Sequence, residues 1–180
     1  FYVNSMVRQA HEQNTDIVLV DTGNSYEGLC EYFNGKYISY TEEHPITMNP
    51  FQIKREEWNI EKLGFLKNLV MLIWKGSQGT VTKTEDKLIE QVINEYYEAH
   101  FGKDGIGRLC FNSFYEFSTR RIPEICDENG LRGIDLASYN YLLKEFYKGG
   151  SHELTLNENM DSSLFDETFI VFEIDSIKGA

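Results

Sequence analysis

Asp21 has the position in this sequence that best suits chemistry on a bound ligand. It follows an apolar, β-branched run at residues 17–20 and precedes a polar loop at 22–25, after which a helical pattern begins. In open α/β sheets, ligands bind at the carboxyl ends of strands and beside the amino-termini of helices. Asp21 is therefore a candidate carboxylate of a nucleotide-binding site. The simpler interpretation, which these residue types favour, is that Asp21, Asn24 or Ser25 caps the helix that follows.

The tripeptide Asp21-Thr22-Gly23 also matches the motif of aspartic proteases. In those enzymes the aspartate shares a proton with a second carboxylate to activate water, which requires a second motif or a dimer on a β-rich body. Helical patterns surround the tripeptide here, so the context argues against proteolysis. The protease stays an alternative function, and inactivity of a dimeric sample on peptides at acidic pH would remove it.

The other side chains that bind metals or act as nucleophiles are scattered along the chain. No His-x-x-x-His or Cys-x-x-Cys spacing is present, and no G-x-x-x-x-G-K-[ST] phosphate loop occurs in the sequence. We therefore predict no metal site and no catalytic residue within this chain. The histidines and cysteines concerned are His11, His44, His100, His152, Cys30, Cys110 and Cys126.

The charge balance bears on partners and location. The chain carries 17 Lys and Arg against 29 Asp and Glu, a formal charge of −12, and so acidic a surface repels a phosphate backbone. Direct nucleic-acid binding by this chain is therefore disfavoured. The longest apolar stretch, residues 69–74, is far shorter than the ~20 residues of a membrane-spanning helix. Because the cysteines are odd in number and widely spaced, reduced thiols and a cytoplasmic location are predicted.

Two kinds of pattern divide the chain. Residues 1–51 have the pattern of helix, strand, helix and strand. Residues 52–150 contain four amphipathic stripes separated by Gly-bearing turns, which predict an all-α insert. Residues 151–180 predict a loop and a returning strand. Two capping-box patterns predict helix starts, Thr82-x-x-Glu85 and Ser113-x-x-Glu116.

The apolar runs at 17–20 and 169–174 have the composition of strands buried on both faces, as in parallel sheets covered by helices. Each run ends in an aspartate, Asp21 or Asp175. Since the carboxyl ends of parallel strands meet at one edge, we expect both runs in a single sheet with both carboxylates at that edge. The predicted fold class is helix-rich α/β, a partial parallel-sheet core interrupted by a large all-α insert.

Seven segments in fixed order carry a family resemblance. They are NSMVRQ (4–9), VLVDTGNSYEGLC (18–30), YTEE (40–43), NPF (49–51), NSFYE (112–116), YKGG (147–150) and FIVFEID (169–175). Together they resemble the TraG-type ATPases of conjugative transposons, relatives of the type IV secretion ATPases in the HerA and FtsK branch. No single motif is specific, but their collinear order spans nearly the whole chain.

The resemblance implies a partial P-loop, RecA-like core. It also implies a parent protein that uses ATP and Mg²⁺ to power conjugative DNA transfer or type IV secretion assembly. In that family the Walker A loop precedes a segment like 1–9 and the Walker B strand follows a segment like 174–180. We therefore expect this chain to be an internal piece that is inactive alone, with Asp21 and Asp175 on the nucleotide side.

The resemblance further implies a homo-oligomeric ring, a hexamer in the parent, located in the cytoplasm and peripheral to the inner membrane. Its partners would be other conjugation or type IV secretion proteins. An alternative from another functional class is an acidic helical interaction module, in which residues 52–150 dock a partner of the secretion apparatus. The two are compatible, because an insert can be the docking surface of an ATPase.

Overall fold

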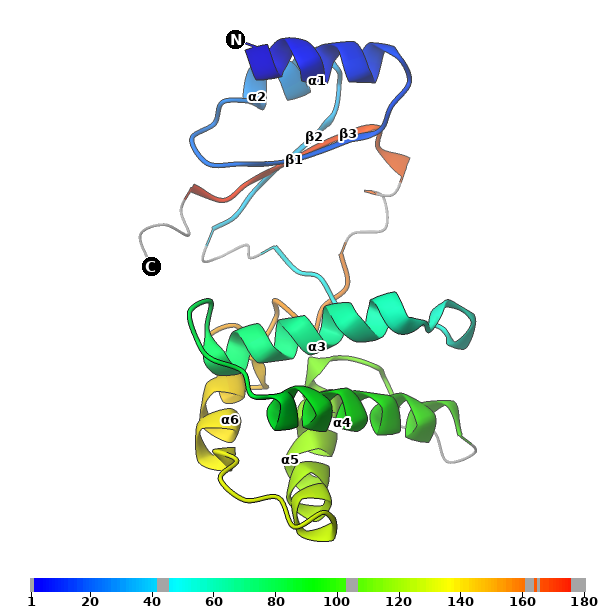
Figure 1. The fold of residues 1–180 in the computed structure, drawn as a ribbon. Helices are drawn as coiled ribbons and strands as arrows, with labels where there is room; N and C mark the ends of the chain where they lie inside the picture. Colours follow the sequence, from blue (N-terminus) through cyan, green and yellow to red (C-terminus); the bar gives the residue numbers. More distant parts are fainter. Residues whose placement is uncertain (1, 42–45, 103–106, 161–163, 165, 176–180) are drawn as a thin grey trace. The chain divides into compact units, whose positions relative to one another are not determined.

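The computed structural model describes residues 2–41, 46–102, 107–160, 164 and 166–175 of the chain. His44 and residues 42–43 of the resembling segments lie outside these ranges. The chain divides into two compact units (Figure 1). The α/β unit comprises residues 1–47 and 159–180, and the helical unit comprises residues 48–158. Within the described ranges, no helix is long and apolar enough to cross a membrane.

Three parallel strands form the sheet of the α/β unit. They are β1 (Ile17–Asp21), β2 (Lys36–Ser39) and β3 (Phe169–Glu173), in the spatial order β1-β3-β2. The central strand β3 pairs with both of the others, so the prediction that the two apolar runs share one sheet is confirmed. The register partner of Asp21 is Glu173. Asp175 lies two residues beyond the end of β3.

Two helices, α1 (Tyr2–Glu12) and α2 (Glu27–Tyr32), cover one face of this sheet (Figure 1). Their apolar side chains pack with strand residues into a small core that includes Val7, Ala10, Ile17, Leu19, Leu29, Cys30, Phe169 and Val171. Gly35 lies between α2 and β2, where a Cβ would collide with the backbone of Phe169. Only glycine fits at this close approach of two chain segments.

The expectation that β1 is buried on both faces is wrong. Successive side chains of a strand alternate between the two faces, and Val18 and Val20, on the face away from the helices, are 62% and 67% exposed. The physical reason is position, because β1 is an edge strand and the described helices of this unit pack on the opposite face. Ile170 of the central strand is buried.

The helical unit is built from four α-helices and two short 3-10 helices within its described residues. They are η1 (Arg55–Glu57), α3 (Ile60–Lys75), α4 (Lys83–Phe101), α5 (Phe111–Glu128), α6 (Leu136–Leu143) and η2 (Lys144–Phe146). Side chains from all four helices meet in one core, with Leu66, Val70, Ile89, Ile93, Tyr96, Tyr97, Phe114, Ile122, Tyr139 and Leu143 among its members.

The boundaries of the two units differ by several residues from the divisions that the sequence pattern indicates. Phe51 and Leu156 are buried in the core of the helical unit. The chain therefore divides between residues 47 and 48 and between 158 and 159, whereas the sequence pattern placed the divisions after residues 51 and 150.

Side-chain caps begin two of the long helices. Ahead of α3, Asn59 Oδ1 accepts hydrogen bonds from the N–H groups of Glu61 and Lys62, at 2.9 and 3.0 Å. Ahead of α4, the predicted capping box forms. The Glu85 N–H donates to Thr82 Oγ1 at 3.2 Å, and the Thr82 N–H donates to Glu85 Oε2 at 2.9 Å. These contacts satisfy backbone donors that have no partner within the helix.

The second predicted capping box is wrong. Helix α5 begins at Phe111, and Ser113 Oγ accepts the N–H of Cys110 at 3.1 Å, so Ser113 lies within the first turn. Glu116 instead accepts a hydrogen bond from the hydroxyl of Tyr147 at 2.6 Å. The earlier start is favourable because it brings Phe111, which is fully buried, into the core as a helical residue.

We expect Thr82→Ala to lower the free energy of unfolding of the helical unit by about 1 kcal/mol, because the Glu85 amide loses its acceptor. Thr80→Ala is the matched control. Thr80 is exposed and precedes the cap, so its loss should change stability by less than about 0.5 kcal/mol. Urea unfolding followed by tryptophan fluorescence reports on this unit, which holds both tryptophans, Trp58 and Trp74. Equal effects of the two substitutions would contradict the cap.

Candidate functional site

The carboxyl ends of β1 and β3 place two acidic residues opposite each other. Asp21 and Glu173 are register partners, and only 8% and 5% of their surfaces are exposed. Burying a charged group without partners is costly. The contacts of these two carboxylates therefore determine what this edge of the sheet can do.

Asp21 accepts hydrogen bonds from the backbone that leads into α2. Its Oδ1 lies 2.8 Å from the Thr22 nitrogen, and its Oδ2 lies 2.6 Å from the Ser25 nitrogen and 3.3 Å from the Tyr26 nitrogen. These donors all precede the first helical residue, so Asp21 holds the loop ahead of α2 and does not cap the helix, whose N-cap residue is Tyr26 with no side-chain cap hydrogen bond. The segment that it holds, residues 22–26, is called the strand-end loop below.

Glu173 holds the same loop from the neighbouring strand. Its Oε1 accepts the N–H groups of Gly23 and Asp175 at 3.2 and 2.8 Å, and its Oε2 accepts the N–H of Asn24 at 2.8 Å. The Tyr37 hydroxyl lies 3.2 Å from Glu173 Oε2 and 2.9 Å from Asn24 Oδ1. Gly23 and Asn24 have φ values of 126° and 56°, which glycine and asparagine tolerate best.

The Glu173 carboxylate is held in its ionised form. Burial by itself favours the protonated acid, but hydrogen bonds from the N–H groups of Asn24, Asp175 and Gly23 outweigh this effect. The pKa of Glu173 therefore lies below its ordinary value of 4.5. Burial and the neighbouring Glu173 charge raise the pKa of Tyr37 to about 12, so at neutral pH its hydroxyl keeps its proton and can donate to the carboxylate.

The structure brings Asp21 and Asp175 to the same edge of the sheet but gives them different surroundings. Asp21 is buried under the strand-end loop, whereas Asp175 lies two residues beyond β3 and is exposed. The sequence interpretation missed Glu173. The available signal was a lone charged residue in the otherwise apolar run of β3, since a charge in a buried strand requires partners.

This arrangement is suited to holding a backbone loop. Each of the four carboxylate oxygens already accepts at least one hydrogen bond. Across the described residues, no group of three or more His, Cys, Asp and Glu side chains is placed to hold a metal ion. The sequence contains no G-x-x-x-x-G-K-[ST] loop. Nothing observed at this edge favours the aspartic-protease alternative.

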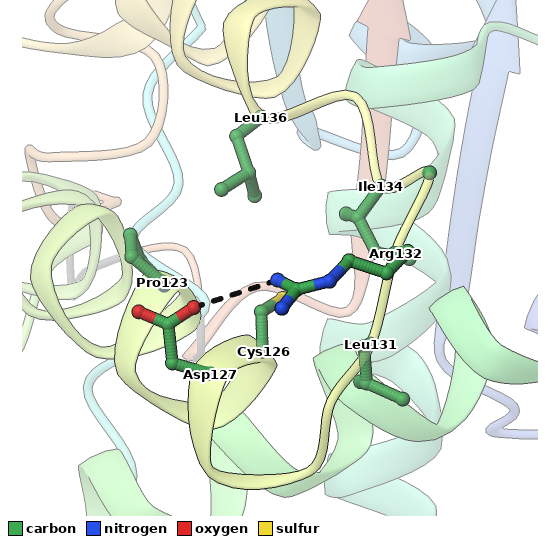
Figure 2. A pocket seen from close by; sticks show the side chains of 8 residues that line it. Pro123, Cys126, Asp127, Leu131, Arg132, Ile134 and Leu136 are labelled. Carbon is green, nitrogen blue, oxygen red and sulfur yellow. Dashed lines mark ion pairs between the residues drawn. The ribbon is translucent and has the colours of Figure 1, made fainter.

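A separate hollow of about 250 Å³ lies in the helical unit, between the end of α5 and the segment leading to α6 (Figure 2). Asp127 and Arg132 face each other across it at 3.8 Å, and both side chains are 82% exposed, so their ion pair contributes little stability. Burial raises the pKa of the Cys126 thiol, which disfavours the nucleophilic thiolate. Among the residues that line this hollow, none is an activated nucleophile.

The chain is similar to the solved structure of VirB4 of Thermoanaerobacter pseudethanolicus, with a TM-score of 0.64 and 19% sequence identity over 99% of this chain. This likeness supports the predicted helix-rich α/β fold of P-loop ATPases. The chain spans about half the length, 47%, of that VirB4 chain.

The sequence was compared with curated proteins and with models of protein families. A search of curated proteins found no match. A family model described as the TraG P-loop domain matches residues 1–180, the whole of the sequence. The chain therefore belongs to the TraG P-loop domain family, a family of conjugation and type IV secretion ATPases.

Proposed function

We propose that this chain is part of an ATPase that powers conjugative DNA transfer or the assembly of a type IV secretion apparatus. The observation that carries the proposal is the parallel sheet whose carboxyl edge holds the strand-end loop, in a chain that matches the TraG P-loop domain throughout. The proposal includes ATP and Mg²⁺ as the parent protein's nucleotide and metal. It also includes a conjugative transposon as the source, a hexameric ring, and a cytoplasmic location at the inner membrane.

In this proposal the strand-end loop borders the nucleotide site. Thr22, Asn24 and Ser25 are exposed, while the loop's backbone donors are engaged by the two buried carboxylates. Asp21 and Glu173 therefore act as positioning groups that set the shape of the loop. Asp21 and Asp175 remain the residues that we assign to the nucleotide side, with Asp21 acting through the loop that it holds.

The 180 residues alone do not hydrolyse ATP in this proposal. Phosphates are held by the amides and the lysine of a G-x-x-x-x-G-K-[ST] loop, and that pattern does not occur in the sequence. Without a metal ion and a phosphate-binding loop, carboxylates such as those of Asp21 and Asp175 repel a triphosphate. Any adenine stacking on an aromatic side chain would be weak.

A second candidate function is the docking of a secretion partner by the helical unit. It is favoured by how charge is distributed along the sequence. The α/β unit carries 3 Lys and Arg against 12 Asp and Glu, whereas the helical unit carries 14 against 17. The acidity that we ascribed to an interaction module is therefore concentrated in the α/β unit. The helical unit has a mixed-charge surface, which suits docking through local patches.

Titration calorimetry with ATP and Mg²⁺ tests the ATPase proposal. We expect no binding by the 180-residue chain, and binding with hydrolysis by a longer stretch of the encoded protein that contains a G-x-x-x-x-G-K-[ST] loop. In that longer protein, Asp21→Asn should lower ATPase activity. The control is Asp16→Asn, because Asp16 is exposed and precedes the other end of β1. Micromolar binding by the 180-residue chain, or no hydrolysis by the longer protein, would overturn the proposal.

Glu173→Gln tests the positioning role, because the new amide group faces backbone donors that need an acceptor. Folding lowers the pKa of Glu173, so the ionised carboxylate stabilises the folded state fully above its ordinary pKa of 4.5. This stabilisation is lost as the pH falls through the lowered pKa. We expect the variant to be less stable than the wild type at pH 7, and the difference to shrink below about pH 4. Thermal unfolding followed by circular dichroism measures the stability difference between the variant and the wild type at each pH. Glu31→Gln, at an exposed position of α2, is the control, and a pH-independent difference would refute the role of the carboxylate.

A further inference from the structure

A groove of about 470 Å³ lies on the helical unit, lined by residues 52–56 ahead of α3, residues 100 and 101 at the end of α4, and residues 108 and 109 ahead of α5. Its apolar lining consists of Ile53, Phe101 and Leu109. Its charged lining consists of Lys54, Arg55 and Arg108 against a single acidic residue, Glu56. An apolar floor therefore lies beside a mainly basic rim, and this feature is called the basic groove below.

Two of the three rim cations, Lys54 and Arg55, are available to a partner. Lys54 and Arg55 are exposed, and neither forms an ion pair with a carboxylate among the residues that the structure describes. Arg55 is nonetheless oriented, because its Nη1 donates to the Phe101 carbonyl at 3.4 Å and its guanidinium lies 5.9 Å from the centre of the Phe101 ring. Arg108 pairs with Glu158 at 3.3 Å, and both side chains are about half exposed.

We propose that the basic groove binds an acidic segment of a partner protein, in which Asp or Glu residues flank one apolar side chain. The apolar side chain would lie on the half-buried ring of Phe101, and the flanking carboxylates would pair with Lys54 and Arg55. We choose an acidic occupant because of charge complementarity. Lys54 and Arg55 form no ion pair with a described carboxylate and lie beside the half-buried Phe101 ring, so they can attract the carboxylates of a partner. Arg108 can exchange Glu158 for a partner carboxylate of the same chemistry.

The net negative charge of the chain favours a short acidic peptide over a long nucleic acid as the occupant of the groove. A nucleic acid long enough to leave the groove would meet a surface with a formal charge of −12, which repels it. A short acidic segment contacts only the groove and its surroundings within about 8 Å, the distance over which physiological salt screens charge. This inference does not depend on ATP hydrolysis by the parent protein.

Fluorescence anisotropy with the 180-residue chain tests the proposal. The probe is a short labelled peptide in which glutamates flank a leucine, measured at about 50 mM salt, where screening is weak. We expect binding that weakens as salt rises. The double variant Lys54→Glu/Arg55→Glu should bind about tenfold more weakly, since two favourable charge contacts become repulsive. A peptide with glutamine in place of glutamate should lose binding as well.

The matched control is the double variant Lys62→Glu/Lys144→Glu, which makes the same charge change at positions of the helical unit outside the groove lining. It should bind the peptide within about twofold of the wild type, because neither side chain lines the groove. Unchanged far-UV circular dichroism confirms that each variant is folded. Absence of peptide binding, equal loss in both double variants, or tighter groove-dependent binding of a single-stranded oligonucleotide would each overturn the proposal.

Discussion

The hydrogen bonds from the strand-end loop to two buried carboxylates are the constraint on which the α/β unit depends. They satisfy the charges of Asp21 and Glu173, which would otherwise be costly to bury. Through Tyr37 of β2 they also join the third strand to the other two. One set of contacts thus links all three strands at the edge where α/β proteins bind ligands. The loop conformation and the strand register stabilise each other.

The helical unit buries many aromatic rings, and two of its fully buried tyrosines keep their hydroxyl groups hydrogen-bonded. The Tyr97 hydroxyl donates to the Phe51 carbonyl at 2.7 Å, and the Tyr139 hydroxyl donates to Ser118 Oγ at 2.9 Å. Burial raises the pKa of both tyrosines, so the hydroxyls remain protonated donors at neutral pH. Directional bonds of this kind favour one packing of the core over its alternatives. The basic groove is therefore built on a well-defined scaffold.

The parts of the fold that sequence predicted are those that depend on local patterns. The two apolar runs, the helical stripes and the Thr82 capping box each follow from spacing within a few residues. Glu173 was missed because its importance depends on register with Asp21, and sequence spacing alone does not reveal register. The exposure of Val18 was missed for a similar reason, since an apolar run does not say which face receives helices.

The basic groove was also invisible in the sequence, because Arg55 and Phe101 are separated by 46 residues. The predicted start of α5 failed for another reason. The motif Ser113-x-x-Glu116 satisfies a capping rule, but burying Phe111 within the helix favours an earlier start. Packing against a distant part of the chain overrides a local signal in such cases.

The strand order β1-β3-β2 has a consequence for the order of folding. β1 and β2 are adjacent in the sequence but do not pair with each other, and each pairs only with β3, whose residues begin at Phe169. The sheet therefore cannot form until β3 has been synthesised, which happens after the whole helical unit has been made. The helical unit, residues 48–158, lies between β2 and β3 in the sequence and can fold during this interval, because contacts over shorter sequence separations form faster than long-range strand pairing. Until β3 arrives, the apolar run of β1 is the segment most exposed to aggregation on the ribosome.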